Sequence, residues 1–174
     1  MRIPSAIITG MALAVVLSSC GSGGDSDSPT GPKRPPPKVA SLGPFVGECG
    51  HVTDDEVRQL AGLSQITRVY KNSTGCNWQS AGLYAPSVTF ASYRGSPIDR
   101  ERAWVSSVGR EPERVEVNGR PGFQALDPGG ICDFAVQLDD DFFEWSISDG
   151  AFASAGNPCD RARKLAELTV GRLR

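Results

Sequence analysis

The sequence contains one histidine, His51, among 174 residues. A single imidazole argues against a His-rich metal site and against a Ser-His-Asp triad. No two cysteines are spaced as CxxC, and neither a Gly-x-Ser-x-Gly elbow nor a phosphate-binding loop occurs. We therefore expect no metal, no cofactor and no catalytic residue, and the protein is predicted not to be an enzyme.

The chain also has no excess of positively charged residues. The chain has 18 Lys and Arg against 20 Asp and Glu, a net charge of -2. Nucleic-acid binding needs a basic surface, so we expect no nucleic-acid partner. Hydrophobic residues make up 39% of the chain and charged residues 22%, which is ordinary for a folded domain.

No apolar run is long enough for a membrane span, which needs about 20 residues. The apolar run at the N-terminus, residues 3–17, follows Met1-Arg2 and is typical of a secretory signal. It ends in Leu17-Ser18-Ser19-Cys20, which resembles the bacterial lipobox. The resemblance implies cleavage before Cys20 and acylation of its thiol, with chains such as palmitate. An ordinary secretory signal is the alternative.

A linker follows the predicted signal peptide of residues 1–19. Gly, Pro and Ser supply 15 of the 24 residues from 21 to 44. Such a composition cannot bury enough apolar surface to offset chain entropy. We expect lipidated Cys20 and a disordered tether over residues 20–44, and one domain over residues 45–174.

Capping signals predict three helices in this domain. Thr53 and Glu56 form a capping box, and Gly62 is a natural stop for that helix. A short helix is expected to begin at Ser96-Pro97, with Ser96 as the cap. The last helix opens at Asn157-Pro158 and continues to Leu173 at helical spacing.

Strand signals lie between the helices. Hairpins are predicted at residues 72–75 and at Asn118-Gly119, and Asp139-Asp140-Asp141 is expected to form a turn. The expected strands cover residues 67–71, 76–79, 87–93, 114–117, 123–126, 131–138 and 142–148. This order predicts an α+β fold, a mostly antiparallel sheet with the N-terminal and C-terminal helices on one face.

Four cysteines remain besides Cys20, and an even count in an exported domain predicts two disulfides. Cys49 and Cys159 lie near the chain ends of the domain, which usually lie close together. Cys76 and Cys132 lie inside predicted strands. We therefore predict the pairs Cys49–Cys159 and Cys76–Cys132. A four-thiolate zinc site is the alternative.

The order of these motifs resembles a family of small actinobacterial lipoproteins, which carry one extracytoplasmic four-cysteine domain of unknown function. The resemblance spans the lipobox and residues 45–174, and it implies location and disulfides but no activity. It rests on a Cys before a capped helix, on a Cys in the central strand, and on the segments Gly75-Cys76-Asn77-Trp78, Asn118-Gly119-Arg120 and Asn157-Pro158-Cys159-Asp160.

The remaining polar candidates all have structural explanations. His51 is interpreted as a surface residue rather than a metal ligand, and the three aspartates at 139–141 lack the spacing of a calcium loop. The carboxylates Glu111, Glu113 and Glu116 are interpreted as an edge strand in ion pairs with Arg110, Arg114 and Arg120, rather than as an acid–base pair.

Aromatic residues supply the candidates for the core. Trp78, Trp104 and Trp145 are predicted to be buried rather than to line a binding site. Phe142 and Phe143 point to opposite faces of their strand. One of the two rings is therefore expected to cover a helix-free surface or a binding groove.

The sequence favours a non-enzymatic binding or protein-interaction module of the cell envelope, anchored on the extracytoplasmic face of the cell membrane through Cys20. An envelope protein or a small apolar ligand is the expected partner besides the membrane. The alternatives are a carboxylate-dependent enzyme acting on cell-wall glycan or polymer, and a carrier of an apolar ligand.

Intact-mass spectrometry tests these expectations together. The mature protein should lack residues 1–19, carry acyl chains on Cys20 and contain no free thiol, because its other four cysteines are oxidised in pairs. An unprocessed precursor with free thiols would contradict both the anchor and the compartment.

Overall fold

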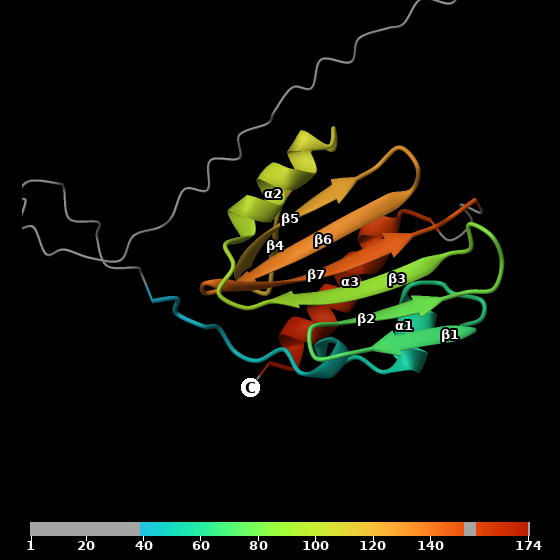
Figure 1. The fold of residues 1–174 in the computed structure, drawn as a ribbon, viewed down its shortest axis with the longest axis horizontal. Helices are drawn as coiled ribbons and strands as arrows, with labels where there is room; N and C mark the ends of the chain where they lie inside the picture. The colour runs from blue at the N-terminus through green and yellow to red at the C-terminus, as the bar shows by residue number, and fades with distance from the viewer. Residues whose placement is uncertain (1–38, 152–155, 174) are drawn as a thin grey trace, which may run out of the picture. The chain divides into compact units, whose positions relative to one another are not determined.

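A sheet of seven antiparallel strands, in the order β1-β2-β3-β7-β6-β5-β4, runs through the computed structural model, which describes residues 39–151 and 156–173 (Figure 1). The strands are β1 Arg68–Lys71, β2 Gly75–Gln79, β3 Ser87–Tyr93, β4 Glu113–Val117, β5 Arg120–Leu126, β6 Ile131–Leu138 and β7 Asp141–Ser148. The helical elements are the 3-10 turn η1 Glu48–His51 and the helices α1 Asp54–Leu60, α2 Ile98–Ser107 and α3 Pro158–Gly171.

The helices divide between the two faces of the sheet. In Figure 1, α1 and α3 lie behind the sheet and α2 lies in front of it. The N-terminal and C-terminal helices thus share one face, and the predicted α+β class is confirmed. The short helix between them covers the opposite face.

The predicted strands and turns are confirmed with small shifts at their ends. Asn118-Gly119 joins β4 to β5, and Asn72 caps the β1–β2 turn by accepting hydrogen bonds from the amides of Thr74 and Gly75, both at 2.9 Å. The third aspartate of the predicted 139–141 turn, Asp141, belongs to β7 instead.

The capping box of the first helix is present as predicted. Thr53 and Glu56 bond reciprocally, with Glu56 N donating to Thr53 Oγ1 at 3.3 Å and Thr53 N donating to Glu56 Oε2 at 2.9 Å. The prediction for α2 was wrong in one respect: its N-cap is Pro97, without a side-chain cap, and Ser96 Oγ accepts a hydrogen bond from Arg100.

Two tryptophans form the centre of the core between the sheet, α1 and α3. Trp78 and Trp145 stack with ring centroids 5.7 Å apart, and both are fully buried. Each indole N–H finds a partner on a helix: Trp78 donates to Asp54 at 2.8 Å and Trp145 to Thr169 at 3.1 Å. Both tryptophans were predicted correctly, but Trp104 was not: on α2 it is 53% exposed.

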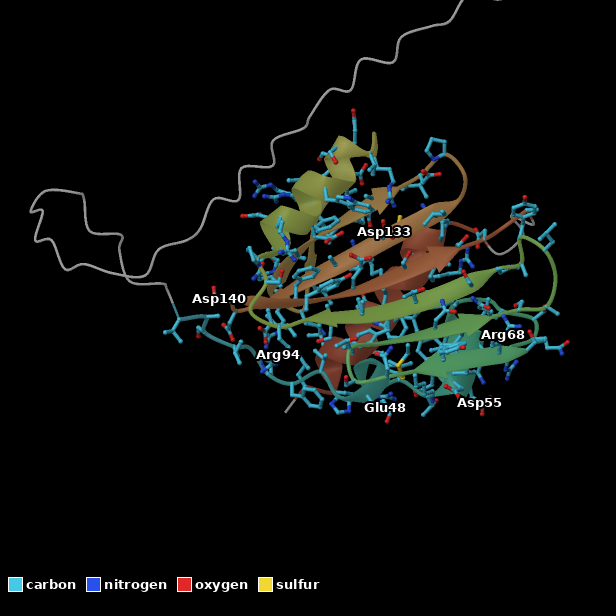
Figure 2. All side chains as sticks on the ribbon, in the orientation of Figure 1. Glu48, Asp55, Arg68, Arg94, Asp133 and Asp140 are labelled. Atoms are coloured by element: carbon cyan, nitrogen blue, oxygen red, sulfur yellow. A yellow bond between two sulfur atoms is a disulfide. The ribbon has the colours of Figure 1, made fainter. Side chains whose placement is uncertain are left out.

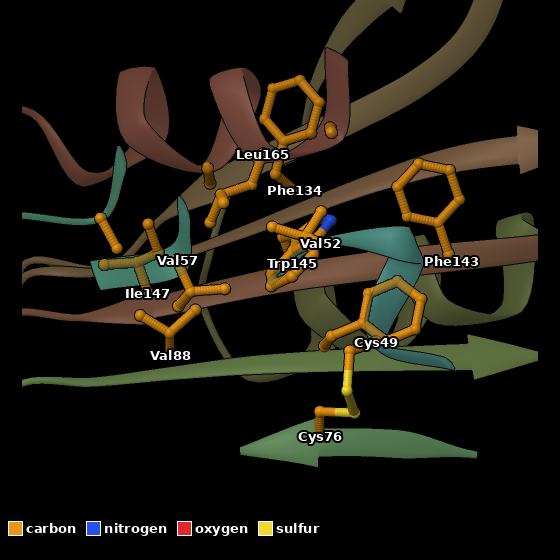
Figure 3. Close-up of a cluster of buried hydrophobic side chains, with 14 of the residues drawn as sticks. Cys49, Val52, Val57, Cys76, Val88, Phe134, Phe143, Trp145, Ile147 and Leu165 are labelled. Atoms are coloured by element: carbon orange, nitrogen blue, oxygen red, sulfur yellow. A yellow bond between two sulfur atoms is a disulfide. The ribbon is translucent and has the colours of Figure 1, made fainter. Parts of the chain in front are cut away.

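The disulfides are paired differently from the prediction. Cys49 bonds to Cys76 and Cys132 bonds to Cys159, with Cα–Cα distances of 5.5 and 5.2 Å. Figure 3 shows the first bridge joining the segment before α1 to β2. The second joins the start of α3 to β6. Each bridge therefore fixes a helical segment to a strand of the face that it covers.

Sheet order explains why the predicted pairs Cys49–Cys159 and Cys76–Cys132 were wrong. Strands β2 and β6 are separated by β3 and β7. Three strand spacings amount to about 14 Å, whereas a disulfide needs Cα atoms within about 7 Å. Cys76 and Cys132 cannot bond across that distance, so each pairs with the helical segment above it.

The last residues of the predicted tether contact the domain. Ser41 N donates to Asp140 Oδ2 at 2.6 Å, and Gly43 N donates to Asp141 Oδ2 at 3.0 Å. Leu42 forms an isolated bridge with Asp139. The signal peptide, Cys20 and the tether up to residue 38 lie outside the described residues, and their assignment stays a prediction.

Removing either disulfide should destabilise the domain to a similar degree, because both close loops of the same length, with a sequence separation of 27 residues. The loop-entropy model gives a loss of about 3–4 kcal/mol for each. Urea denaturation of the double variants C49A/C76A and C132A/C159A measures this. A peptide map without reduction that shows Cys49 linked to Cys159 would contradict the pairing.

Candidate functional site

The face of the sheet that carries α2 is only half covered. Helix α2 packs on β5 and β6, where Val105 meets the buried side chains of Phe123, Ala125, Ala135 and Phe142. In Figure 1, β3, β2 and β1 lie in front of α1, and no helix or strand of the described residues lies over them on the α2 side. We call this uncovered part, formed by the α2-side residues of β1, β2 and β3, the open half.

Polar residues occupy one row across the open half. In the strand pairing, Tyr70 lies opposite Asn77, Asn77 opposite Thr89, and Thr89 opposite Ser146. Directly opposed residues point to the same face, so these side chains form one line. Asn77 donates to Thr89 Oγ1 at 2.8 Å. The row continues under α2 to Asp133, which lies opposite Ser146.

Small residues form the next row and leave a hollow. Gly75 lies opposite Ala91, and a Cβ at position 75 would stand 2.7 Å from the carbonyl oxygen of Phe90. The resulting hollow has a volume of about 680 Å³, within the range of small-molecule sites. We call it the sheet-face groove. Its lining includes Tyr70, Asn72, Thr74, Gly75, Asn77, Thr89, Ala91, Tyr93, Arg94, Ser96 and Arg100.

Two arginines lie at one end of the groove, one in an ion pair and the other not. Arg94 is held by Asp141 at 2.8 Å and by the carbonyl oxygen of Gly43 at 3.1 Å. Arg100 donates to Ser96 Oγ at 2.8 Å, and it has no ion pair with any described carboxylate. The guanidinium of Arg100 therefore keeps donors available to a bound group. Figure 2 labels Arg94 and Arg68 at opposite ends of the open half.

A carboxyl group without a hydrogen-bond partner lies beside the groove. Glu144 on β7 stands opposite Ala91 on one side and Ala135 on the other. Its Oε2 is enclosed and accepts no hydrogen bond from any described residue. Asp133, labelled in Figure 2, is by contrast fully engaged: it pairs with Arg110 and accepts a 2.6 Å hydrogen bond from Ser146.

Burial raises the pKa of Glu144 to about 8, and the negative charges of Asp133 and Glu101 act in the same direction. Burial likewise raises the pKa of Tyr93, which lines the groove, to about 12, with a further contribution from Glu144. Glu144 therefore keeps its proton to a higher pH than an ordinary carboxyl group does.

Most residues singled out from the sequence lie away from the groove. His51 is exposed at the end of η1, and its carbonyl oxygen accepts a hydrogen bond from Arg172 at 2.5 Å. Within residues 39–151 and 156–173 no cluster of His, Cys, Asp or Glu is arranged to hold a metal ion. Across the same ranges no helix is long and apolar enough to span a membrane.

The predicted ion pairs of the edge strand are not formed. β4 is an edge strand, but no described ion pair joins Glu111, Glu113 or Glu116 to the predicted arginines. Arg110 binds Asp133 instead, and Glu113 accepts a 3.0 Å hydrogen bond from Gln124.

The two rings of Phe142 and Phe143 point to opposite faces, as predicted, but neither covers a helix-free surface. Phe143 packs in the core beneath α3, and Phe142 stacks on Tyr93 with ring centroids 4.3 Å apart. Both are at most 1% exposed. It is Tyr93, the neighbour of Phe142, that lines the groove.

Sequence reasoning missed the groove and Glu144. A signal for the groove was present, because β2 and β3 alternate between apolar residues and small or polar ones. Such alternation is typical of a sheet with one face open to solvent. Glu144 could not be identified, since its raised pKa depends on α2 and β6, which lie on it from elsewhere in the chain.

Comparison with known proteins gives a family without an assigned activity. Residues 15–172 match the family described as "Protein of unknown function (DUF3558)". The chain belongs to this family. Proteins named "Putative lipoprotein LprB" are 33% identical to it in Mycobacterium bovis and Mycobacterium tuberculosis, over 97% of this chain and 95% of theirs. The relative of that name in Mycobacterium leprae is 31% identical over 92% and 88%. No solved structure matches the chain.

The resemblance to small lipoproteins of unknown function is confirmed, because the chain belongs to the DUF3558 family and its relatives are named lipoproteins. Family membership assigns no catalytic residue and no ligand to this chain. Any activity has to be argued from the groove and the groups around it.

Replacing Glu144 by glutamine should change how stability depends on pH. The folded-state pKa of about 8 exceeds the ordinary value of 4.5, so Glu144 favours the folded state fully below pH 4.5. That contribution is lost as the pH rises from 4.5 through 8, on the order of 5 kcal/mol. In Glu144→Gln this loss should be absent, as shown by urea denaturation from pH 4 to 9.

The exposed residue Glu167 on α3 offers a matched control. Glu167→Gln should keep the wild-type pH dependence. Identical pH curves for wild type and Glu144→Gln would show that Glu144 ionises normally in the folded protein.

Proposed function

We propose that the protein is a lipid-anchored binding module of the cell envelope, held on the extracytoplasmic face of the membrane through Cys20. The lipobox at Cys20, the tether that follows and the name of the mycobacterial relatives support the anchor. Two acyl chains give stable attachment, because each buried methylene contributes about 0.8 kcal/mol. The binding part of the proposal rests on the sheet-face groove.

The single observation that carries the binding function is a hollow of about 680 Å³ lined by convergent polar and aromatic side chains. A ligand site has this composition: a concave surface with a few polar groups that fix orientation. Tyr70 is 68% exposed at its rim, and Asn77 and Thr89 stand on its floor side. Aromatic rings kept accessible in this way are common at binding sites.

The enzymatic alternative has one observation in its favour, the raised pKa of Glu144 beside Asp133. A glycan hydrolase of the usual kind needs two carboxyl groups flanking a cleft. Asp133 is occupied by Arg110 and Ser146, and neither carboxyl group is among the residues that line the groove. Binding therefore accounts for the groove better than catalysis does.

The carrier alternative calls for an enclosed apolar cavity of several hundred Å³. The groove lies on an uncovered sheet face, and Asn, Thr, Ser and Arg side chains contribute to its lining. A polar or amphipathic ligand suits this surface better than an apolar one.

Filling the groove should abolish ligand retention. In Ala91→Trp the indole would occupy the floor between Gly75 and Tyr93, whereas Ala103→Trp places the same ring on the exposed side of α2. The full-length chain and both variants are purified from the native envelope, and small molecules that co-purify are identified by mass spectrometry. Wild type and Ala103→Trp should retain a ligand that Ala91→Trp has lost.

A second variant covers the case in which Ala91→Trp does not fold. Tyr70→Ala removes an exposed side chain, so it leaves the core intact, and it should lower the amount of bound ligand several-fold. The same co-purifying molecules in equal amounts with wild type, Ala91→Trp and Tyr70→Ala would overturn the binding function of this groove.

A further inference from the structure

The strands of the open half carry charges of one sign. β1, β2 and β3 contain no Asp or Glu, and their charged residues are Arg68, on the α2 side with Tyr70, and Lys71, on the opposite face. Lys71 forms a 2.8 Å ion pair with Asp54, whereas Arg68 has no ion pair with a described carboxylate. Arg94 and Arg100 add two further cations at the groove. Lys71 and Arg94 are neutralised by Asp54 and Asp141, so Arg68 and Arg100 are the cations of this face that have no described ion-pair partner.

Asp141, the carboxylate beside Arg94, does not bind Arg100. Asp141 is 2% exposed and fully engaged: Gly95 N donates to its Oδ1 at 2.6 Å, and Gly43 N and Arg94 bond its Oδ2 at 3.0 and 2.8 Å. It neutralises Arg94. Arg100, bonded to Ser96, keeps its charge and its remaining N–H donors for a ligand.

A guanidinium with free donors recognises carboxylate and phosphate groups, because its planar fork matches two of their oxygens. The other side chains of the groove suit hydroxyl groups. Asn77 uses its amide nitrogen on Thr89 Oγ1 and on the carbonyl oxygen of Val88, which leaves its amide oxygen as an acceptor. Tyr70 and Tyr93 supply aromatic rings on which the C–H face of a sugar ring can pack.

The backbone argues against an extended peptide as the ligand. β2 is paired with β1 and β3, and β3 with β2 and β7, so their main-chain groups are already used in the sheet. A peptide bound by strand addition would need a free edge. The free edge on this side of the sheet is that of β1. Over β2 and β3, recognition must therefore come from side chains, as it does for carbohydrates.

We propose that the sheet-face groove binds an anionic carbohydrate, with Arg100 on its carboxylate or phosphate group and with Tyr70, Asn77 and Tyr93 on its sugar rings and hydroxyls. This inference rests on the proposed binding function and narrows it to a ligand class. Arg100 is the specificity-determining residue, and the polar row supplies binding that does not depend on charge.

Isothermal titration of the full-length chain in detergent at pH 7 tests the inference with three probes. Tetragalacturonate carries carboxylates, pentamannose phosphate carries a phosphate, and maltotetraose is neutral. One or both acidic probes should bind at least tenfold more tightly than maltotetraose, and less tightly at 200 mM than at 20 mM salt. The acidic probe that binds shows whether the groove recognises a carboxylate or a phosphate group.

Two variants separate charge recognition from general binding. Arg100→Gln should weaken the acidic probe about tenfold and leave the neutral one unchanged. Arg102→Gln on the same helix is the control, because the Arg102 guanidinium is bonded to Asp99 at 2.5 Å and does not line the groove. It should bind like the wild type.

Two results would overturn the inference. If maltotetraose binds as tightly as the acidic probes, the groove binds carbohydrate without selecting for charge. If none of the three probes binds, the ligand is not an acidic carbohydrate. In both cases the retention of a native ligand, compared between wild type and Ala91→Trp, still decides the proposed function independently.

The pH dependence of binding gives a further check. Glu144 faces Asp133 on β6, Glu101 on α2, Arg110 after α2 and Tyr93 on β3, and its pKa is raised to about 8. Its ionisation adds a negative charge beside Ala91. Binding of the acidic probe should therefore weaken several-fold from pH 7 to pH 9, and this decline should be absent in Glu144→Gln.

Discussion

The single helix on one face sets what this fold leaves exposed. α2 packs mainly on β5 and β6, and a helix about 10 Å across covers about two strands, whereas seven strands are about 29 Å across. Helices α1 and α3 together cover the opposite face, but α2 alone cannot cover its own. The apolar side chains follow this division, since Phe123 and Phe142 lie beneath α2 while Tyr70, Asn77 and Thr89 lie beyond it. The groove is a direct consequence of a sheet that is wider than its covering helix.

Covalent links keep the well-covered face in place. Each disulfide joins a strand to the helical segment above it, one at β2 and one at β6. Arg161 fixes α3 further, because it pairs with Asp149 and donates a hydrogen bond to the carbonyl oxygen of Ala61. After the C-terminal end of α3, Arg172 binds Glu56 at 2.6 Å, and this ion pair lowers the pKa of Glu56 to about 2. The helices of this face are thus held at several points, and the open face needs no support of its own.

Local sequence signals predicted the helices, strands and turns well, because these elements depend on residues that are close together in the sequence. The capping box at Thr53, the Asn118-Gly119 hairpin and the alternation in residues 131–138 each depend on neighbours in sequence. The disulfide pairing depended on strand order, which places β7 next to β3 and separates Cys76 from Cys132, and nothing local records this order. Trp104 was wrongly predicted to be buried, and Glu144 was not identified at all, for the same reason: both depend on where α2 lies.

Glu144 lies at the boundary between the covered and the open parts of this face, and its position costs stability. Its neighbours in the row, Ala91 and Ala135, are small, so an apolar side chain could fill the same space without a buried carboxyl group. At neutral pH the folded state keeps a proton that the unfolded chain would release, which lowers the free energy of unfolding. The carboxyl group of Glu144 thus departs from the most stable choice of residue at a position beside the groove, and the proposed site would account for that departure.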